Sequence, residues 1–88
     1  MAGKTKQDYD KRDIAIGIAL KHFRTMPQRD LKQLEIAEHF NKSLSWYNDI
    51  ERGKTALSWK DVLELCDFMK IDIAELSDYT RMLLEKGK

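Results

Sequence analysis

The chain has 88 residues, of which 16 are Lys or Arg, 15 are Asp or Glu and 42% are hydrophobic, with a net charge of +1. This length accommodates one small domain, and the apolar fraction is too high for a wholly disordered chain. A single cysteine excludes an internal disulfide, and no apolar stretch approaches the ~20 residues of a membrane span, so we expect a cytoplasmic protein that does not enter the membrane.

The small net charge hides an uneven distribution along the chain. Residues 1–32 contain eight basic and four acidic residues, whereas the remainder contains eight basic and eleven acidic residues. A near-neutral total argues weakly against nonspecific polyanion binding, but a site-specific DNA binder depends on where its charges lie.

The N-terminal part predicts an arm followed by a helix. Residues 1–12 are polar and lack periodicity, which indicates a flexible charged arm. From Asp13, a candidate N-cap, apolar residues recur at helical spacing as far as Phe23. Pro27 ends this helix because its ring disfavours α geometry at Met26.

A second, short helix is expected from Asp30 to about Phe40. Asp30 followed three residues later by Gln33 has the form of a capping box. Asn41 tolerates the left-handed conformation with which helices often end. We therefore expect a tight turn directly after this helix.

Three further helices follow at short intervals. Ser43 is a candidate N-cap for a helix over residues 44–52, which Gly53 stops. Ser58 begins a fourth helix that runs to about residue 69, in which we expect Trp59 and Cys66 to pack rather than to bind a ligand. Asp72 begins a fifth. Because no strand-like alternation persists, the sequence predicts an all-α fold.

Two short helices joined by a few residues suggest a helix-turn-helix. Ala37 is a small residue where the second helix of such a pair crosses the first. Large apolar residues from both helices should enter the shared core, among them Ile36, Phe40, Tyr47 and Ile50. These features together place the unit between residues 33 and 52.

The stretch of residues 31–54 reads LKQLEIAEHFNKSLSWYNDIERGK and resembles the Cro/repressor-type (XRE-like) helix-turn-helix DNA-binding domain. Gln33 matches the family's first-helix Gln, Ala37 its near-invariant Ala, and residues 51–54 its ErGk ending. The likeness extends over about residues 14–76. It implies a compact five-helix bundle of the lambda-repressor-like type over residues 13–76, in which helix 44–52 enters the major groove.

The sequence departs from the family pattern at the turn and on the outward face of this helix. Asn41 replaces the usual turn Gly, and Lys42 stands where the family usually has an apolar residue. The outward positions include no Arg or Gln, which are the commonest readers of guanine and adenine. Any selectivity for DNA sequence would therefore depend on an unusual set of side chains.

The expected DNA-contacting residues occupy the start of the second helix, the turn, the third helix and the residues after it. They are Gln33, Lys42, Ser43, Leu44, Ser45, Trp46, Asn48, Asp49, Arg52 and Lys54. The resemblance implies that Gln33 bonds a phosphate and braces the third helix, with helix capping as the alternative role of Gln33, and that Glu51 braces the following loop. Ser45 and Asn48 can bond base edges or phosphates, and Arg52 can hold a phosphate.

Several of these residues have a competing interpretation. A carboxylate at position 49 can accept from cytosine, but an intrachain pair with Arg52 or Lys54 is favoured slightly because Asp49 would repel phosphates. Leu44 and Trp46 can touch thymine methyl groups or form a protein-binding patch. Ser43 is foremost an N-cap.

The C-terminal residues 77–88 predict a helical extension. Tyr79, Met82, Leu83 and Leu84 supply more apolar surface than a last helix needs to close a small domain. A homodimer contact is preferred here over packing onto the protein's own first helix, since two-fold operators call for two-fold proteins.

The function expected from these features is a sequence-specific transcriptional regulator, a repressor, whose partner is double-stranded DNA. Two alternatives stay open: a protein-interaction module on the same fold, or the antitoxin of a toxin–antitoxin pair, with a toxin or antirepressor as protein partner. We expect no enzyme activity and no cofactor. His22, His39 and Cys66 lack metal-ligand spacing, so we expect no metal site either.

Overall fold

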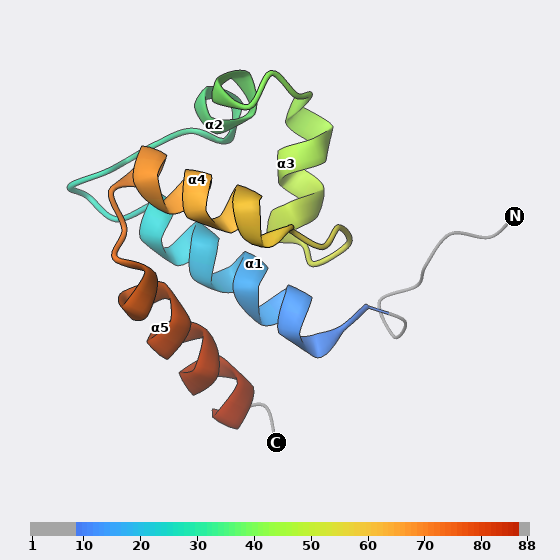
Figure 1. Cartoon of the computed structure of the whole chain (residues 1–88), viewed down its shortest axis with the longest axis vertical. Coiled ribbons are helices and arrows are strands. Elements are labelled where there is room, and N and C mark those ends of the chain that lie inside the picture. Colours follow the sequence, from blue (N-terminus) through green and yellow to red (C-terminus); the bar gives the residue numbers. More distant parts are fainter. Residues whose placement is uncertain (1–8, 87–88) are drawn as a thin grey trace, which may run out of the picture.

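The computed structural model describes residues 9–86, which form five helices and no strands. The helices are α1 (Lys11–Arg24), α2 (Gln33–His39), α3 (Leu44–Glu51), α4 (Trp59–Met69) and α5 (Ile73–Lys86). The prediction of an all-α fold with five helices joined by short links is therefore confirmed (Figure 1).

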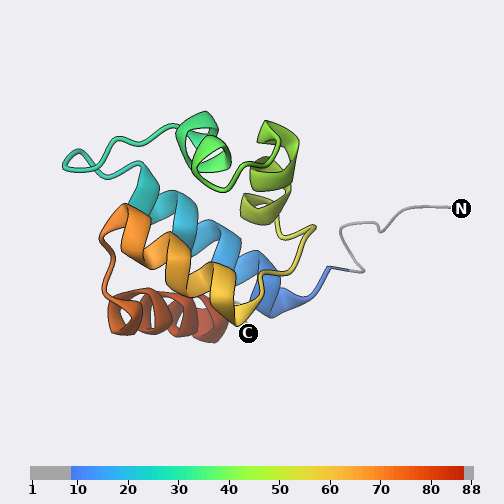
Figure 2. The ribbon, with the colours of Figure 1, turned by 45° about the horizontal axis from the view of Figure 1, so that its top comes forward.

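Helix α1 lies in the middle of the molecule. It packs against α5 on one side and against α3 on the other, while α2 packs against α3. Figures 1 and 2 both show α2 and α3 together at one end and α5 at the opposite end, with α1 and α4 between them. The second and third helices thus form a unit that packs on α1 through α3.

One hydrophobic core joins all five helices. Its largest fully buried side chains come from four of them: Leu20, Ile36, Tyr47, Ile50, Leu65 and Met69. Leu76 adds the fifth helix, and Ala19 and Ala37 are completely buried where helices approach closely. Most residues of the apolar stripes expected from the helical period face the core, but Ile18 of α1 is 46% exposed. Cys66 packs in the core, where burial raises the pKa of its thiol.

Helix α1 begins earlier than the sequence suggested. Its N-cap is Asp10, whose carboxylate accepts from the backbone N–H of Arg12 at 2.7 Å; Asp13 lies inside the first turn. Lys11 and Arg12 accordingly belong to the helix and not to an arm. Of the arm expected over residues 1–12, residues 1–8 lie outside the described residues, and Tyr9 and Asp10 directly precede the helix.

The start of α2 also differs from expectation. Asp30 is not the N-cap; it adopts a left-handed backbone with a φ of 43°. The cap is Lys32, whose backbone N–H donates to the Glu35 carboxylate at 3.1 Å. The link is shaped instead by Arg29, which donates to the carbonyl oxygens of Met69 and Lys70 at 2.7 and 3.0 Å and so ties this loop to the end of α4.

The remaining helix starts match the sequence. Ser58 accepts from the backbone N–H of Asp61 at 3.1 Å, and Asp72 accepts from that of Ala74 at 2.7 Å. Helix α5 then runs without a break past residue 76, where a C-terminal extension was expected to begin. Tyr79 stacks on His22 of α1 at a ring-centroid distance of 4.3 Å, so part of this region does pack onto the first helix.

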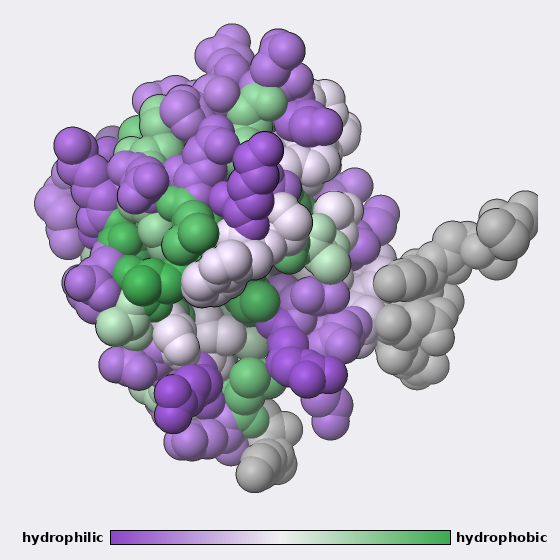
Figure 3. Space-filling view, viewed as in Figure 1, coloured by the Kyte–Doolittle hydropathy of each residue, from purple (hydrophilic) through white to green (hydrophobic). Residues whose placement is uncertain are grey.

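The expectation that Trp59 packs is wrong, because 66% of this residue is exposed. Leu63, one turn later, and Ile73 at the start of α5 are also exposed. Figure 3 shows hydrophobic residues gathered over α4 and the first part of α5, whereas the surface over α2 and α3 is largely hydrophilic. Within residues 9–86, no helix has the length and apolar character needed to cross a membrane.

Candidate nucleic-acid interface

The unit of α2, turn and α3 is built by a few local constraints. Ala37 is completely buried, which allows close approach of the two helices. Asn41 adopts the left-handed conformation expected of it, with a φ of 56°. The backbone N–H of Lys42 then closes the turn by donating to the carbonyl oxygen of Ala37 at 2.9 Å. A four-residue link, residues 40–43, thus reverses the chain between α2 and α3.

Helix α3 begins and ends where the sequence indicates. The hydroxyl oxygen of Ser43 accepts from the backbone N–H of Trp46 at 3.1 Å, which confirms Ser43 as the N-cap. Arg52 is the C-cap, and Gly53 ends the helix with a φ of 79°, a left-handed conformation that favours glycine. The predicted boundary at residue 52 is therefore accurate to one residue.

Two glycines set how closely α3 approaches α1. A Cβ atom at Gly17 would lie 2.5 Å from the carbonyl oxygens of both Ile50 and Glu51. A Cβ atom at Gly53 would lie 2.6 Å from the Ile14 side chain. The backbones of α1 and the end of α3 thus lie so close together that neither glycine position has room for a side chain.

A buried ion pair joins the same two helices. Arg24 of α1 donates from Nε and Nη2 to the two carboxylate oxygens of Glu51 at 2.6 and 3.0 Å, and the Glu51 side chain is only 3% exposed. Arg24 also donates to the carbonyl oxygen of Leu31 at 2.9 Å. The Glu51 hydrogen bonds raise the pKa of Arg24. Glu51 therefore braces α1 and not the loop after α3, and the sequence did not single out Arg24 as its partner.

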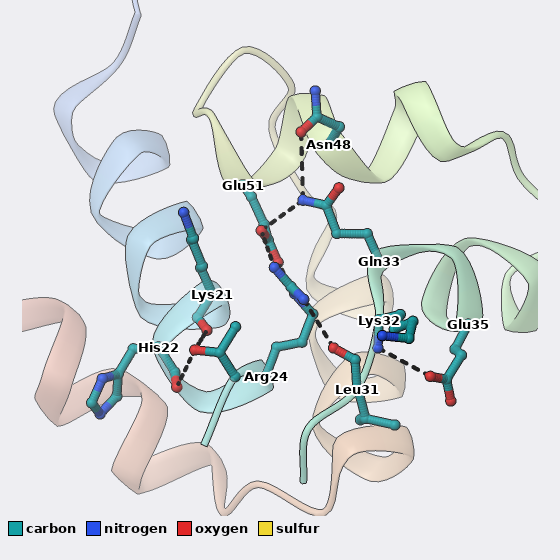
Figure 4. A network of polar contacts seen from close by, with 10 residues as sticks. Lys21, His22, Arg24, Leu31, Lys32, Gln33, Glu35, Asn48 and Glu51 are labelled. Carbon is teal, nitrogen blue, oxygen red and sulfur yellow. Dashed lines mark hydrogen bonds and ion pairs between the residues drawn. The ribbon is translucent and has the colours of Figure 1, made fainter. Parts of the chain in front are cut away.

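Gln33 connects this pair to the surface of α3. Its Nε2 donates to Oε1 of Glu51 at 2.8 Å and forms a longer hydrogen bond of 3.4 Å with Oδ1 of Asn48 (Figure 4). Gln33 thus braces α3 through side chains of that helix, as the resemblance implied. Gln33 and Asn48 are each half-buried.

Tyr47 fills the space beside this network. The residue is completely buried, and its hydroxyl has no hydrogen-bond partner within the described part of the chain. Burial, followed by the Glu51 charge, raises the pKa of Tyr47 strongly. Tyr47 therefore stays neutral and supports α3 by packing.

The ten candidate contact residues all lie on this end of the molecule. Six are exposed: Lys42, Ser43, Leu44, Ser45, Arg52 and Lys54. Gln33, Trp46, Asn48 and Asp49 are half-buried. Ser45 and Leu44 in the first turn of α3 stand free to meet a ligand, while Arg52 and Lys54 follow at its other end.

Trp46 and Asp49 each make contacts within the chain. The Trp46 ring lies 5.3 Å from that of Phe40 and packs against the core, which leaves less of it available to a ligand than an outward position implied. A carboxylate oxygen of Asp49 lies 3.9 Å from Nζ of Lys54. This contact agrees with the intrachain pair that was slightly favoured for Asp49. Among residues 9–86, Lys42 and Arg52 have no carboxylate within ion-pair distance.

The arrangement defines a class of protein. A short helix, a tight turn with Asn41 in the left-handed conformation and a second helix with an exposed first turn form a helix-turn-helix, a module whose second helix enters the major groove of DNA. Within residues 9–86, no group of three or more His, Cys, Asp or Glu side chains could hold a metal ion.

The chain belongs to the helix-turn-helix domain family, whose model matches residues 15–78. It is similar to two crystal structures of the clp gene regulator ClgR from Corynebacterium glutamicum, each at 24% identity. One match has a TM-score of 0.71 and covers 82% of this chain and 90% of that ClgR chain. The other has a TM-score of 0.73 and covers 89% of this chain and 82% of that ClgR chain. These likenesses show the same fold. A comparison with curated proteins gave no match.

Proposed function

We propose that this protein is a sequence-specific DNA-binding transcriptional regulator whose helix α3 enters the major groove. The observation that carries this proposal is the network of the buried Arg24–Glu51 pair with the half-buried Gln33, which ties α3 to α1 and α2 while the first turn of α3 stays exposed. Preorganised side chains lose little freedom on binding, which favours a selective contact. ClgR, which shares the fold, is a clp gene regulator.

The charges around α3 support the same proposal. Lys42 precedes the helix, and Arg52 and Lys54 follow it, so cations lie at both ends of the proposed reading helix. Phosphate contacts from such residues set the register of a protein on DNA, while base contacts give specificity. With a total charge of +1, we expect weak nonspecific affinity and a modest dependence on salt.

The test is a selection of duplexes from a random pool, followed by titration of the selected duplex at several salt concentrations. Saturable binding that weakens as salt rises supports the proposal. A palindromic consensus would further support a two-fold complex. Absence of saturable binding at low salt would refute DNA binding.

A protein-interaction module remains the second candidate because Leu44 is 46% exposed at the start of α3. An exposed leucine on a helix that otherwise presents polar groups suits a protein surface as well as a thymine methyl group. A Leu44→Ala variant separates the two. Unchanged DNA affinity together with loss of a co-purifying protein, such as a toxin or antirepressor, would favour the interaction module.

The finer proposal is a cytoplasmic homodimeric repressor that excludes other proteins from a promoter. An apolar groove between the start of α1 and the end of α5, lined by Ile14, Ala15, Ile18, Leu83 and Leu84, is the candidate contact. The oligomeric state of an Ile18→Glu variant, measured by sedimentation, tests this contact. Leu63→Glu is the control, since Ile18 and Leu63 are exposed to a similar degree, 46% and 42%. A dimer that only Ile18→Glu disrupts supports this contact; a monomeric wild type contradicts it.

A further inference from the structure

The donor and acceptor roles in the hydrogen bonds around Glu51 can be assigned step by step, from the buried ion pair to the protein surface. Arg24 donates to both oxygens of Glu51, and a guanidinium can only donate. The carboxylate therefore acts as an acceptor, and the group of Gln33 that lies 2.8 Å from it must be the NH₂ group. The opposite orientation would place the Gln33 carbonyl oxygen against a carboxylate oxygen with no proton between them.

The orientation of Gln33 in turn constrains Asn48. The Gln33 NH₂ group carries a second proton, and the Asn48 group 3.4 Å away is Oδ1, an acceptor. Since Oδ1 of Asn48 faces Gln33, its NH₂ group points the other way, as Figure 4 shows. A buried charge thus sets the polarity of an amide at the surface of α3.

We propose that Glu51 is a positioning residue: acting through Gln33, it turns the Asn48 amide so that an N–H donor faces the DNA. Asn48 then contacts a hydrogen-bond acceptor, which is a phosphate oxygen or an acceptor on a base edge. Oδ1 of Asn48 already accepts one hydrogen bond from Gln33, whereas its Nδ2 group points away from that bond. This inference rests on the proposed DNA-binding function.

The amide polarity is tested first without DNA, by side-chain amide hydrogen exchange in the full chain measured by NMR. We expect the Nε2 protons of Gln33 to exchange about threefold to tenfold more slowly than the Nδ2 protons of Asn48. Slower exchange at Asn48 would overturn the proposal. In a Glu51→Gln variant, the protection of Gln33 should fall while the backbone amides of α1 stay protected; unchanged protection would exclude the positioning role.

A second variant keeps the experiment decisive if Glu51→Gln does not fold. Gln33→Leu leaves the Arg24–Glu51 pair in place and frees the Asn48 amide to rotate. In that background, Asn48→Ala should reduce DNA affinity by a smaller factor than it does in the wild type. Equal factors in the two backgrounds would show that Gln33 does not position Asn48.

The DNA contact is tested on the selected duplex. We expect Asn48→Ala to weaken binding by about tenfold to a hundredfold, with Gln28→Ala, an exposed amide in the α1–α2 loop, as a control that binds like the wild type. A loss confined to the selected duplex identifies a base acceptor, and an equal loss on unrelated duplexes identifies a phosphate oxygen. Wild-type affinity in Asn48→Ala would overturn the contact. If the wild type binds no DNA, the proposed function fails, while hydrogen exchange still decides the amide polarity.

Discussion

The guanidinium of Arg24 donates two hydrogen bonds to the carboxylate of Glu51, and this pair joins the end of α1 to the end of α3. The two residues are 27 positions apart in the chain, and both side chains are buried. A pair of buried charges is costly to desolvate, so its presence favours a specific geometry more than it favours stability. Here the geometry concerned is the placement of α3 on α1.

Breaking this pair on one side should strongly destabilise the fold. We expect Arg24→Met to lower the free energy of unfolding by about 3–5 kcal/mol, because Glu51 is left as a buried charge with Gln33 as its remaining hydrogen-bond donor. The double variant Arg24→Met with Glu51→Met should recover much of this loss. Urea unfolding, monitored by circular dichroism, gives the free energy of unfolding of the wild type, the single variant and the double variant.

Arg12→Met is the matched control for Arg24→Met. Arg12 also pairs with an aspartate, Asp10, but at 3.4 Å and with 77% of its side chain exposed. Such surface pairs contribute about 0–1 kcal/mol. Equal losses for the two arginine variants would contradict the importance assigned to burial.

Gly17 should tolerate no larger side chain, although it lies inside a helix. In an open helix, Gly→Ala stabilises by about 0.5–1 kcal/mol. At Gly17 the new Cβ atom would lie 2.5 Å from the backbone of α3, so we expect Gly17→Ala to destabilise by about 1–3 kcal/mol instead. Thermal unfolding measures the sign directly.

The exposed residue Ser77 in α5 provides the comparison for Gly17. Ser77→Ala should leave stability unchanged or raise it slightly, since alanine has the higher helix propensity. If Gly17→Ala also stabilised the protein, the close approach of α1 and α3 would be disproved. Weaker DNA binding by a folded Gly17→Ala protein would show that this approach sets the placement of α3.

The local features of the fold could be read from the sequence because each depends on neighbouring residues. Ser43 and Ser58 are N-caps, and each hydroxyl accepts from the backbone N–H of the residue three positions later. Asn41 adopts the left-handed conformation that an asparagine tolerates. Asp30 shows the limit of such reasoning. It matches a cap pattern, but the tether from Arg29 to Met69, 40 residues away, sets the path of the loop.

The sequence predicts which part of the chain carries the candidate site, but not how that site is organised internally. Spacing predicts candidate contacts on and around α3, whereas the pairing of Arg24 with Glu51 depends on how two distant helices cross. Trp59 illustrates the same point for burial. Its register matches that of Val62 and Cys66, yet it is exposed because a register specifies a helix face and not how far a neighbour covers it.

The stability of the protein at high pH should depend on Tyr47. Its pKa is raised in the folded state, so above the ordinary value of about 10 the unfolded chain loses a proton that the folded chain keeps. Stability from this residue is therefore present below pH 10 and falls as the pH rises further, by about 1.4 kcal/mol for each pH unit.

Tyr47→Phe should remove this alkaline loss. At neutral pH the variant should be as stable as the wild type or more so, since the deleted hydroxyl is buried without a hydrogen-bond partner in residues 9–86. Urea unfolding of both proteins between pH 7 and about 11 gives the comparison. Parallel pH profiles would show that the hydroxyl of Tyr47 has no part in alkaline unfolding.

Arg52 should contribute affinity for DNA without selectivity. It is exposed at the end of α3, where a phosphate contact is the expected role. We expect Arg52→Ala to weaken binding to all duplexes by a similar factor and to reduce the slope of log K against log salt by about 1. The measurement is a set of titrations on the selected and an unrelated duplex at several salt concentrations.

Arg81→Ala removes the same charge from an exposed position on α5, at the far end of the molecule in Figure 1, and should leave the slope unchanged. A loss of affinity confined to the selected duplex would instead make Arg52 a base-reading residue.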